Sequence, residues 1–314
     1  MDLMKAIRIH QYGGPEVLRF ENLPWPQPDP DQVLVRIHSA GVNHTDWKIR
    51  AGYLQQRMPF HLPITLGGDF SGTVVAVGAD VLGFKRGDEV FGQADAWNGG
   101  SGSFAEYALA RSQSIALKPS RVRHAEAGGL PMAGVSALQA LTEHLRISAG
   151  QSILIHGGAG GIGSIAIQLA RHLGAHVVTT VSACDAGFAR TLGAEEIVGY
   201  KKHRFEERLR DLDAVFDTVG GDTYARSFKV LKPGGRIVSL VELPRPELTD
   251  EFRVEAFAQF TQITTARLAK LALLVEQGAL KPYAGLVLPL EHAPRALLGL
   301  ERRALKGKVI LGVA

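Results

Sequence analysis

Two patterns of apolar and polar residues divide the chain. Up to about residue 119 the apolar residues form short alternating runs, separated by Gly and Pro. Alternation with a period of two is typical of half-buried β-strands. We therefore expect a mostly β unit over residues 1–119, with strands at residues 33–38, 72–77, 89–91 and 104–109.

From residue 120 the pattern changes to short apolar runs that alternate with segments of helical period. This alternation predicts βαβ units and therefore a doubly wound parallel sheet of the Rossmann type over residues 120–262. The expected strands are 152–156, 175–181, 214–217 and 236–240, and the expected helices are 163–172, 186–192 and 223–230. Residues 263–314 then predict a helix at 263–277, followed by Gly278 as a C-cap, and a last strand at 307–311.

Composition narrows the class of protein. The formal charge is only +4, and no block of like charges indicates nucleic acid as the partner. A single cysteine, Cys184, forms no internal disulfide, and neither a signal-peptide pattern nor an apolar run of membrane-spanning length is visible. We expect a cytoplasmic protein that does not enter the membrane.

The strongest motif is a glycine cluster. Gly158, Gly160 and Gly163 form G-x-G-x-x-G between an expected strand and an expected helix. There the glycines permit a tight turn and a close approach of the backbone to a pyrophosphate, and the N–H groups that begin the helix face the anion. A tight turn without a ligand is the alternative. The predicted dinucleotide loop consists of Gly158, Ala159, Gly160, Gly161, Ile162 and Gly163.

The end of the second strand predicts NADPH as the cofactor. NAD sites normally place a carboxylate about 20 residues after the first glycine, whereas this chain has Thr180 and Ser182 there, and Asp185 follows only after the turn. Small hydroxyls leave room for a 2′-phosphate and can donate to it. Tyr200 and Lys201 follow the next strand and could close over the same phosphate, and a solvated basic turn is the alternative for the lysine.

Five further segments carry a resemblance to a known family. They are residues 41–46 (GVNHTD), 67–72 (GGDFSG), 87–92 (GDEVFG), 130–137 (LPMAGVSA) and 215–221 (VFDTVGG). Over essentially its whole length the chain resembles the medium-chain dehydrogenase/reductase superfamily, and within it the zinc-independent, ζ-crystallin-like quinone oxidoreductases. The resemblance implies a GroES-like catalytic domain formed by residues 1–119 and 263–314, with the Rossmann domain inserted between them. It also implies a homodimer joined through a strand near residues 254–260.

The residue types at two positions argue against zinc. The zinc alcohol dehydrogenases, which the chain also resembles, have Cys where this chain has Asn43 and His where it has Gly68. Zinc needs three or four N, S or O ligands, but His38, His44 and His61 are scattered through the first domain. We therefore expect no metal.

The resemblance also assigns site residues. It implies that Asn43 and Asp46 lie beside the nicotinamide ribose, although a turn-forming Asn and a helix N-terminal Asp are the alternatives. Tyr53 is the nearby candidate for the proton donor, but it lies one position before the family's tyrosine, so water or a ribose hydroxyl is the other candidate. The remaining residues that we assign to the cofactor are Met132, Ser136, Val219, Leu240 and, near its phosphates, Lys308.

Without a Lewis-acid metal, hydride from NADPH needs an electron-poor acceptor. A quinone is our leading prediction, and the double bond of an enone or 2-alkenal is the alternative, since both reactions share these motifs. An NADPH-binding structural or RNA-binding protein with little turnover is the alternative outside enzymes, but the low charge argues against RNA.

Overall fold

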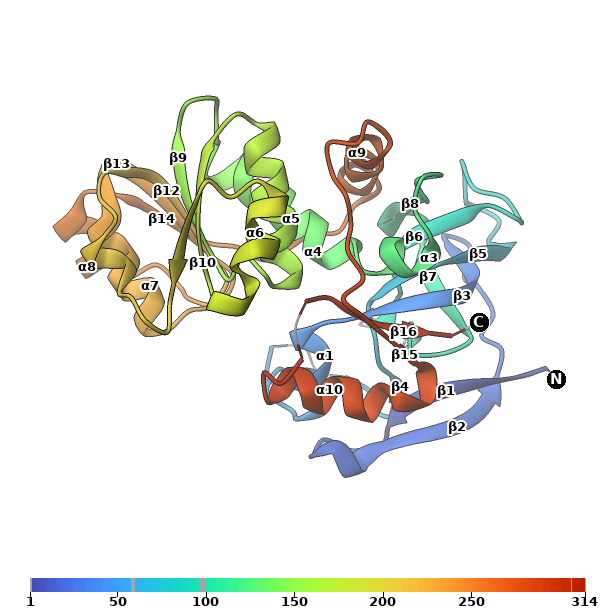
Figure 1. Ribbon diagram of the computed structural model, residues 1–314. Coiled ribbons are helices and arrows are strands. Elements are labelled where there is room, and N and C mark those ends of the chain that lie inside the picture. The colour runs from blue at the N-terminus through green and yellow to red at the C-terminus, as the bar shows by residue number, and fades with distance from the viewer. Residues whose placement is uncertain (1, 58–59, 97–99, 306, 314) are drawn as a thin grey trace. The chain divides into compact units, whose positions relative to one another are not determined.

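Figure 1 shows the computed structural model, which describes residues 2–57, 60–96, 100–305 and 307–313. The chain forms two compact units. Unit 1 comprises Met1–Met132, Ile263–Gln277 and Pro282–Ala314, and unit 2 comprises Ala133–Gln262 and Gly278–Lys281. Unit 1 is therefore assembled from segments on both sides of unit 2 in the sequence.

Two sheets form unit 1. In the larger sheet the strand order is β15-β16-β3-β5-β6-β8, and β7 also pairs with β3. The smaller sheet has the order β2-β1-β4. The strands are β1 (Leu3–Ile9), β2 (Leu18–Pro24), β3 (Gln32–Val42), β4 (Ile64–Thr65), β5 (Asp69–Val77), β6 (Glu89–Gln93), β7 (Tyr107–Arg111), β8 (Ile115–Leu117), β15 (Leu286–Pro289) and β16 (Val309–Gly312).

The central strand of unit 1 is β3, which pairs with segments from both ends of the unit. It lies antiparallel to β5 along most of its length, and Val42 to Ser39 pair with Val309 to Gly312 of β16. The core around these strands is apolar, and Val35, Phe70 and Leu311 are buried in it. Sequence segments more than 260 residues apart thus form one sheet.

The helices of unit 1 are short. In the described part of the unit they are α1 (His44–Arg50), α3 (His124–Gly128), α9 (Thr265–Glu276) and α10 (Ala293–Glu301), and α4 (Pro131–Gln139) begins at the end of the unit. The helix predicted at 263–277 is confirmed as α9, whose N-cap Thr264 accepts a hydrogen bond from the backbone N–H of Arg267.

Most of the strands predicted for the first unit are confirmed, but one is misplaced. The strand expected at 104–109 begins at Tyr107. Phe104 and Ala105 are buried in an irregular segment that makes only a single bridge to Ala6. These two residues are apolar because they are buried, and not because they belong to a strand.

Unit 2 contains the parallel sheet that the sequence predicts, and the expected fold class is confirmed. Its strand order is β11-β10-β9-β12-β13-β14, and every neighbouring pair is parallel. The strands are β9 (Ser152–His156), β10 (His176–Val181), β11 (Glu196–Gly199), β12 (Leu212–Asp217), β13 (Leu231–Ser239) and β14 (Glu255–Ala258). The helices between them are α5 (Gly161–His172), α6 (Ala186–Leu192), α7 (Asp222–Ser227) and α8 (Pro246–Phe252).

The strand order reverses direction at β9. Strands β10 and β11 continue to one side of β9, and β12, β13 and β14 continue to the other side. In open parallel sheets the crevice outside the carboxyl ends of the strands at such a reversal is where ligands bind. The loop after β9, which carries the glycine cluster, lies at this point.

Candidate functional site

Two positions of the loop between β9 and α5 leave no room for a side chain. A Cβ placed on Gly163 would lie 2.2 Å from the carbonyl oxygen of Gly157, and one placed on Gly158 would lie 2.2 Å from Oγ1 of Thr179. Gly157 has φ +72°, a conformation that L residues rarely adopt. Strand β10 and helix α5 therefore pack so closely against this loop that Gly158 and Gly163 cannot carry a side chain.

Helix α5 begins with unused hydrogen-bond donors. Its N-cap is Gly160, which has no side chain to cap the helix, and the first three N–H groups belong to Gly161, Ile162 and Gly163. These groups have no partner within the helix. Together with the helix dipole they form an anion site of the kind that holds a pyrophosphate. Ala159 is half-buried and Gly160 is exposed beside them.

A buried histidine, His156, is hydrogen-bonded to residues that support this loop. His156 is fully buried; Nε2 lies 2.9 Å from Oγ of Ser227, and Nδ1 lies 3.0 Å from Oγ1 of Thr180. Because Ser227 donates its own proton to the carbonyl of Thr223, Nε2 of His156 must be the donor and Nδ1 the acceptor. Burial lowers the pKa of His156 to about 3, which keeps this single neutral tautomer.

Thr180 completes the same hydrogen-bond chain. Its hydroxyl donates to His156 and accepts from the backbone N–H of Gly157 at 3.3 Å. Thr180 is itself buried. The hydroxyl that the sequence suggested for the 2′-phosphate is thus engaged in holding the glycine loop. No spacing rule marked His156, because His156 and its two partners come from three different βα units.

At the end of β10 the structure adds a carboxylate. Asp185 turns back through the short 3-10 helix η4 (Ala183–Asp185), and the Ser182 hydroxyl donates to it. The sequence predicted hydroxyls without an acid at this turn, and that expectation is wrong because the tight turn brings Asp185 onto Ser182. Tyr200 and Lys201 are both exposed at the end of β11.

Asp217 joins the loops after β12 and β13. Its carboxylate accepts from the backbone N–H groups of Val219 and Gly220, each at 3.0 Å, and from the hydroxyl of Ser239 at 2.7 Å. The N–H of Leu240 donates to the backbone carbonyl of Asp217. Val219 and Leu240, which the resemblance assigns to the cofactor, are therefore positioned by one buried acid that the sequence analysis did not single out.

Ser136 lies in a second network of unit 2. Its hydroxyl lies 2.7 Å from that of Thr261, and its carbonyl accepts from Nε2 of Gln259 at 3.0 Å. Ser136 and Gln259 are both buried. Helix α4 is thereby fixed to the segment that follows β14.

Unit 1 contains a buried polar cluster at the N-terminus of α1. Asn43 is the N-cap, and its backbone N–H donates to Oδ2 of Asp46 at 2.7 Å, as in a capping box. Its side chain meets Asp69 and Lys308, and Oδ1 of Asp69 also accepts from the backbone N–H of Met132 at 3.1 Å. The capping alternatives for Asn43 and Asp46 are thus real contacts, and both residues lie in the same charged cluster.

Burial changes the titration of both acids. It raises the pKa of Asp46 to about 7, mainly by desolvation, with the nearby Asp69 adding to the effect. Burial also raises the pKa of Asp69, although Lys308 and Asn43 act in the opposite direction. A carboxyl that titrates near neutrality is suited to exchange protons, and such groups gather at functional sites.

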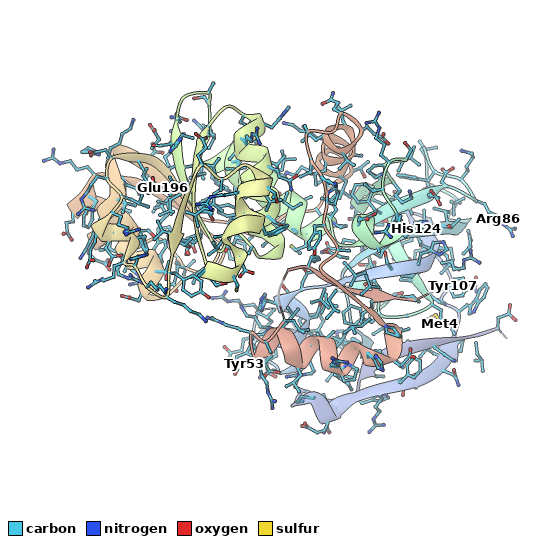
Figure 2. The ribbon with its side chains drawn as sticks, in the orientation of Figure 1. Met4, Tyr53, Arg86, Tyr107, His124 and Glu196 are labelled. Carbon is cyan, nitrogen blue, oxygen red and sulfur yellow. The ribbon has the colours of Figure 1, made fainter. Side chains whose placement is uncertain are left out.

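Tyr53 and Lys308, the other two candidate site residues described here for unit 1, differ in burial. Tyr53, labelled in Figure 2, lies three residues beyond α1, is 73% exposed and meets Trp47 edge-on. Lys308, in contrast, is 7% exposed, and its ammonium group is engaged by side chains of unit 1.

Among the described residues, no group of three or more His, Cys, Asp or Glu side chains is arranged to hold a metal ion. His38 meets the hydroxyl of Thr73, and His44 accepts from the indole of Trp47. Across the same part of the chain, no helix is long and apolar enough to cross a membrane.

The comparisons with known proteins agree with this architecture. Residues 29–120 match the alcohol dehydrogenase GroES-like domain, and residues 192–311 match the zinc-binding dehydrogenase family. The chain is 37% identical over 286 residues to the 2-methylene-furan-3-one reductase of Solanum lycopersicum. The aligned region covers 89% of this chain and 71% of that protein.

Solved structures extend the similarity to the whole chain. The quinone oxidoreductase of Coxiella burnetii is 34% identical, covers 100% of both chains and superposes with a TM-score of 0.92. The quinone oxidoreductase of Escherichia coli, solved in complex with NADPH, is 28% identical, covers 98% of this chain and 99% of that chain, and gives a TM-score of 0.88. The chain belongs to the medium-chain dehydrogenase/reductase superfamily and is a quinone oxidoreductase-like member of it.

Proposed function

We propose that this chain is an NADPH-dependent, zinc-independent quinone oxidoreductase. The observation that carries the proposal is the anion site at the start of α5, where Gly163 admits no side chain, in a chain whose relatives over its whole length include quinone oxidoreductases. A reductase of enones or 2-alkenals is the second candidate, which the relative named for a methylene-furanone supports.

The residues of unit 2 fit NADPH. The N–H groups of residues 161–163, with Gly158, Ala159 and Gly160 beside them, would hold the pyrophosphate. Ser182, Tyr200 and Lys201 would meet the 2′-phosphate, and Thr180 would act indirectly through Gly157. Ser136, Val219 and Leu240 are our candidates for the nicotinamide half, and we retain Met132 and Lys308 from unit 1 as further cofactor candidates.

NADPH, when bound, supplies the hydride. The residues of this chain supply position and hydrogen bonds. Asn43 would donate an N–H to an oxygen of the acceptor or the ribose, and Asp46, with its pKa near neutrality, would hold a proton beside it. Tyr53 and water remain the other proton donors that we consider.

The test is oxidation of NADPH, with NADH as control, in the presence of 1,4-benzoquinone, 9,10-phenanthrenequinone, a 2-alkenal or an acyclic enone. Turnover confined to the quinones supports the proposal, whereas saturated products from the alkenal or enone favour the second candidate. Binding of NADPH without turnover of any acceptor would contradict both candidates and favour a binding or structural role.

We further propose a cytoplasmic homodimer. Strand β14 lies at the edge of the parallel sheet, and Phe260 just beyond it is 70% exposed. An uncovered strand edge pairs readily with a second copy. Sedimentation equilibrium tests the dimer, and Phe260→Lys should shift it toward monomer.

We retain residues 1–119 and 263–314 as the catalytic domain and residues 120–262 as the Rossmann domain.

A further inference from the structure

We propose that Asp69 and Lys308 are positioning residues that hold the carboxamide of Asn43 in one orientation. The sequence motifs place Lys308 near the cofactor phosphates and assign no role to Asp69. The consequence for turnover rests on the proposed function. The contacts themselves all lie within unit 1.

The three side chains form a closed triangle. Nζ of Lys308 donates to Oδ1 of Asn43 at 2.6 Å, and Nδ2 of Asn43 donates to Oδ2 of Asp69 at 3.0 Å. Nζ of Lys308 lies 3.2 Å from the same Oδ2, which closes the triangle with an ion pair. Each end of the carboxamide therefore meets a group of opposite polarity.

The charges distinguish the two ends of the amide. Rotating the carboxamide of Asn43 by half a turn would place its NH₂ group against an ammonium that only donates, and its oxygen against a carboxylate oxygen. Hydrogen bonds to charged partners are stronger than those between neutral groups. The Asp69–Lys308 pair thus selects one of two orientations that a neutral pocket would distinguish poorly.

The triangle is built into the surrounding backbone. A Cβ on Gly41 would lie 3.1 Å from Cε of Lys308, and one on Gly129 would lie 2.9 Å from its Cγ. Glycine at these positions gives the long aliphatic stem of Lys308 its room. Asp69 is also fixed from behind by the N–H of Met132.

The fixed amide still has a free donor. Nδ2 of Asn43 carries two N–H groups, and Asp69 takes one of them. Asp69 and Lys308 are buried, whereas Asn43 is only half-buried. The remaining N–H therefore belongs to the triangle's accessible member, where a preorganised donor can stabilise negative charge that develops on an acceptor oxygen.

The first test separates kcat from KM. Lys308→Met keeps the stem and removes the charge, and it should lower kcat about 10- to 100-fold, since small misplacements of a reacting group have effects of this size. KM for NADPH should stay nearly unchanged. Lys270→Met, an exposed lysine on α9, is the matched control and should change neither constant. A rise in KM with kcat preserved would overturn the proposal and return Lys308 to the cofactor phosphates.

A double-mutant cycle tests whether Lys308 acts through Asn43. Asn43→Ala and the double variant N43A/K308M should have about the same kcat, because Lys308 has nothing left to position. Independent, multiplying losses would contradict the proposal. Asp69→Asn, which keeps the side-chain shape, gives the same comparison if Lys308→Met does not fold.

A third measurement does not depend on turnover. The carboxamide signals of Asn43, assigned by their loss in Asn43→Ala, are observed by ¹⁵N–¹H NMR in the protein without substrate. In the wild type they should be two separate signals that exchange slowly with water, and in Lys308→Met they should shift and exchange faster. Unchanged signals would overturn the positioning role. If the wild type reduced no acceptor, the proposed function would fail while these spectra still decided the role of Lys308.

Discussion

Asp46 combines two opposing effects in one side chain. As an acid in the first turn of α1 it stabilises the helix by accepting the N–H of Asn43. Complete burial opposes this gain by favouring the protonated form. The balance between the two depends on pH, which makes Asp46 a residue whose contribution can be measured.

We predict that Asp46 makes unit 1 less stable as pH rises. Its pKa in the folded state, about 7, exceeds the unfolded value near 3.8, so the stabilising proton is fully bound below about pH 4 and is lost as pH rises through 7. Asp46→Asn, which can still cap, should gain up to ~4 kcal/mol relative to the wild type between pH 4 and pH 8. Urea unfolding across this range measures the difference, and parallel pH profiles would contradict it.

A second prediction concerns the pair at the end of β10. Asp185 takes the hydroxyl of Ser182 and adds negative charge where a 2′-phosphate would bind. Asp185→Asn should therefore raise affinity for NADPH about 10-fold while leaving NADH nearly unchanged, an effect of ~1.4 kcal/mol. Ser182→Asp should weaken NADPH more than NADH. Fluorescence titration with both cofactors measures this, and equal changes for both would remove Ser182 and Asp185 from the phosphate site.

At the scale of the element, the β9–α5 turn separates the needs of the fold from those of the ligand. Gly163 faces the backbone of Gly157, whereas Gly160 is exposed and a Cβ there would meet only that carbonyl, at 3.2 Å. Gly163 therefore serves packing, and Gly160 leaves space for an incoming anion.

Two alanine variants should therefore behave differently. Gly163→Ala should destabilise unit 2 by about 2 kcal/mol or more, because backbone must move. Gly160→Ala should fold normally and bind NADPH at least about 10-fold more weakly. Gly187→Ala in α6, where a Cβ meets nothing within 4 Å, is the control and should stabilise the helix by ~0.5–1 kcal/mol. Stable, tight-binding Gly160→Ala would contradict the assignment of this turn to the pyrophosphate.

What the sequence can predict follows from how local each feature is. The glycine loop is contiguous and bounded by a strand and a helix, so its pattern was enough to place it. The triangle of Asn43, Asp69 and Lys308 joins residues 239 and 265 positions apart, and no periodicity links them. Asp185 illustrates a third case, since its distance along the chain was known but the turn that returns it to Ser182 was not.

At the scale of the whole molecule, the last strand belongs to the first sheet. Leu311 is fully buried in the core of unit 1, and β16 pairs with β3. The sequence predicted a strand at 307–311, but strand patterns carry no information about the partner. The resemblance assigned residues 263–314 to the first domain, and the structure identifies β3 as the partner strand.

We predict that damage to β16 is felt in unit 1 and not in unit 2. Leu311→Ala should cost about 2–5 kcal/mol and raise amide hydrogen exchange in β3 and β5. Exchange in β9 and β12 should be unchanged. Leu154→Ala, at an equally buried position of β9, is the matched variant and should give the reverse pattern. Equal loss of protection in both units would show that they unfold as one.

The pairing of β3 with β16 also sets an order of events during protein synthesis. Residues 39–42 leave the ribosome early, but their partners at 309–312 are made more than 260 residues later. All of unit 2 is synthesised in the interval and can fold as soon as Lys281 has emerged. Throughout that time this stretch of β3 has an open edge, which is the kind of surface that chaperones cover and that aggregates when left bare. The yield of this protein in a cell should thus depend on how fast the ribosome crosses the second half of the message.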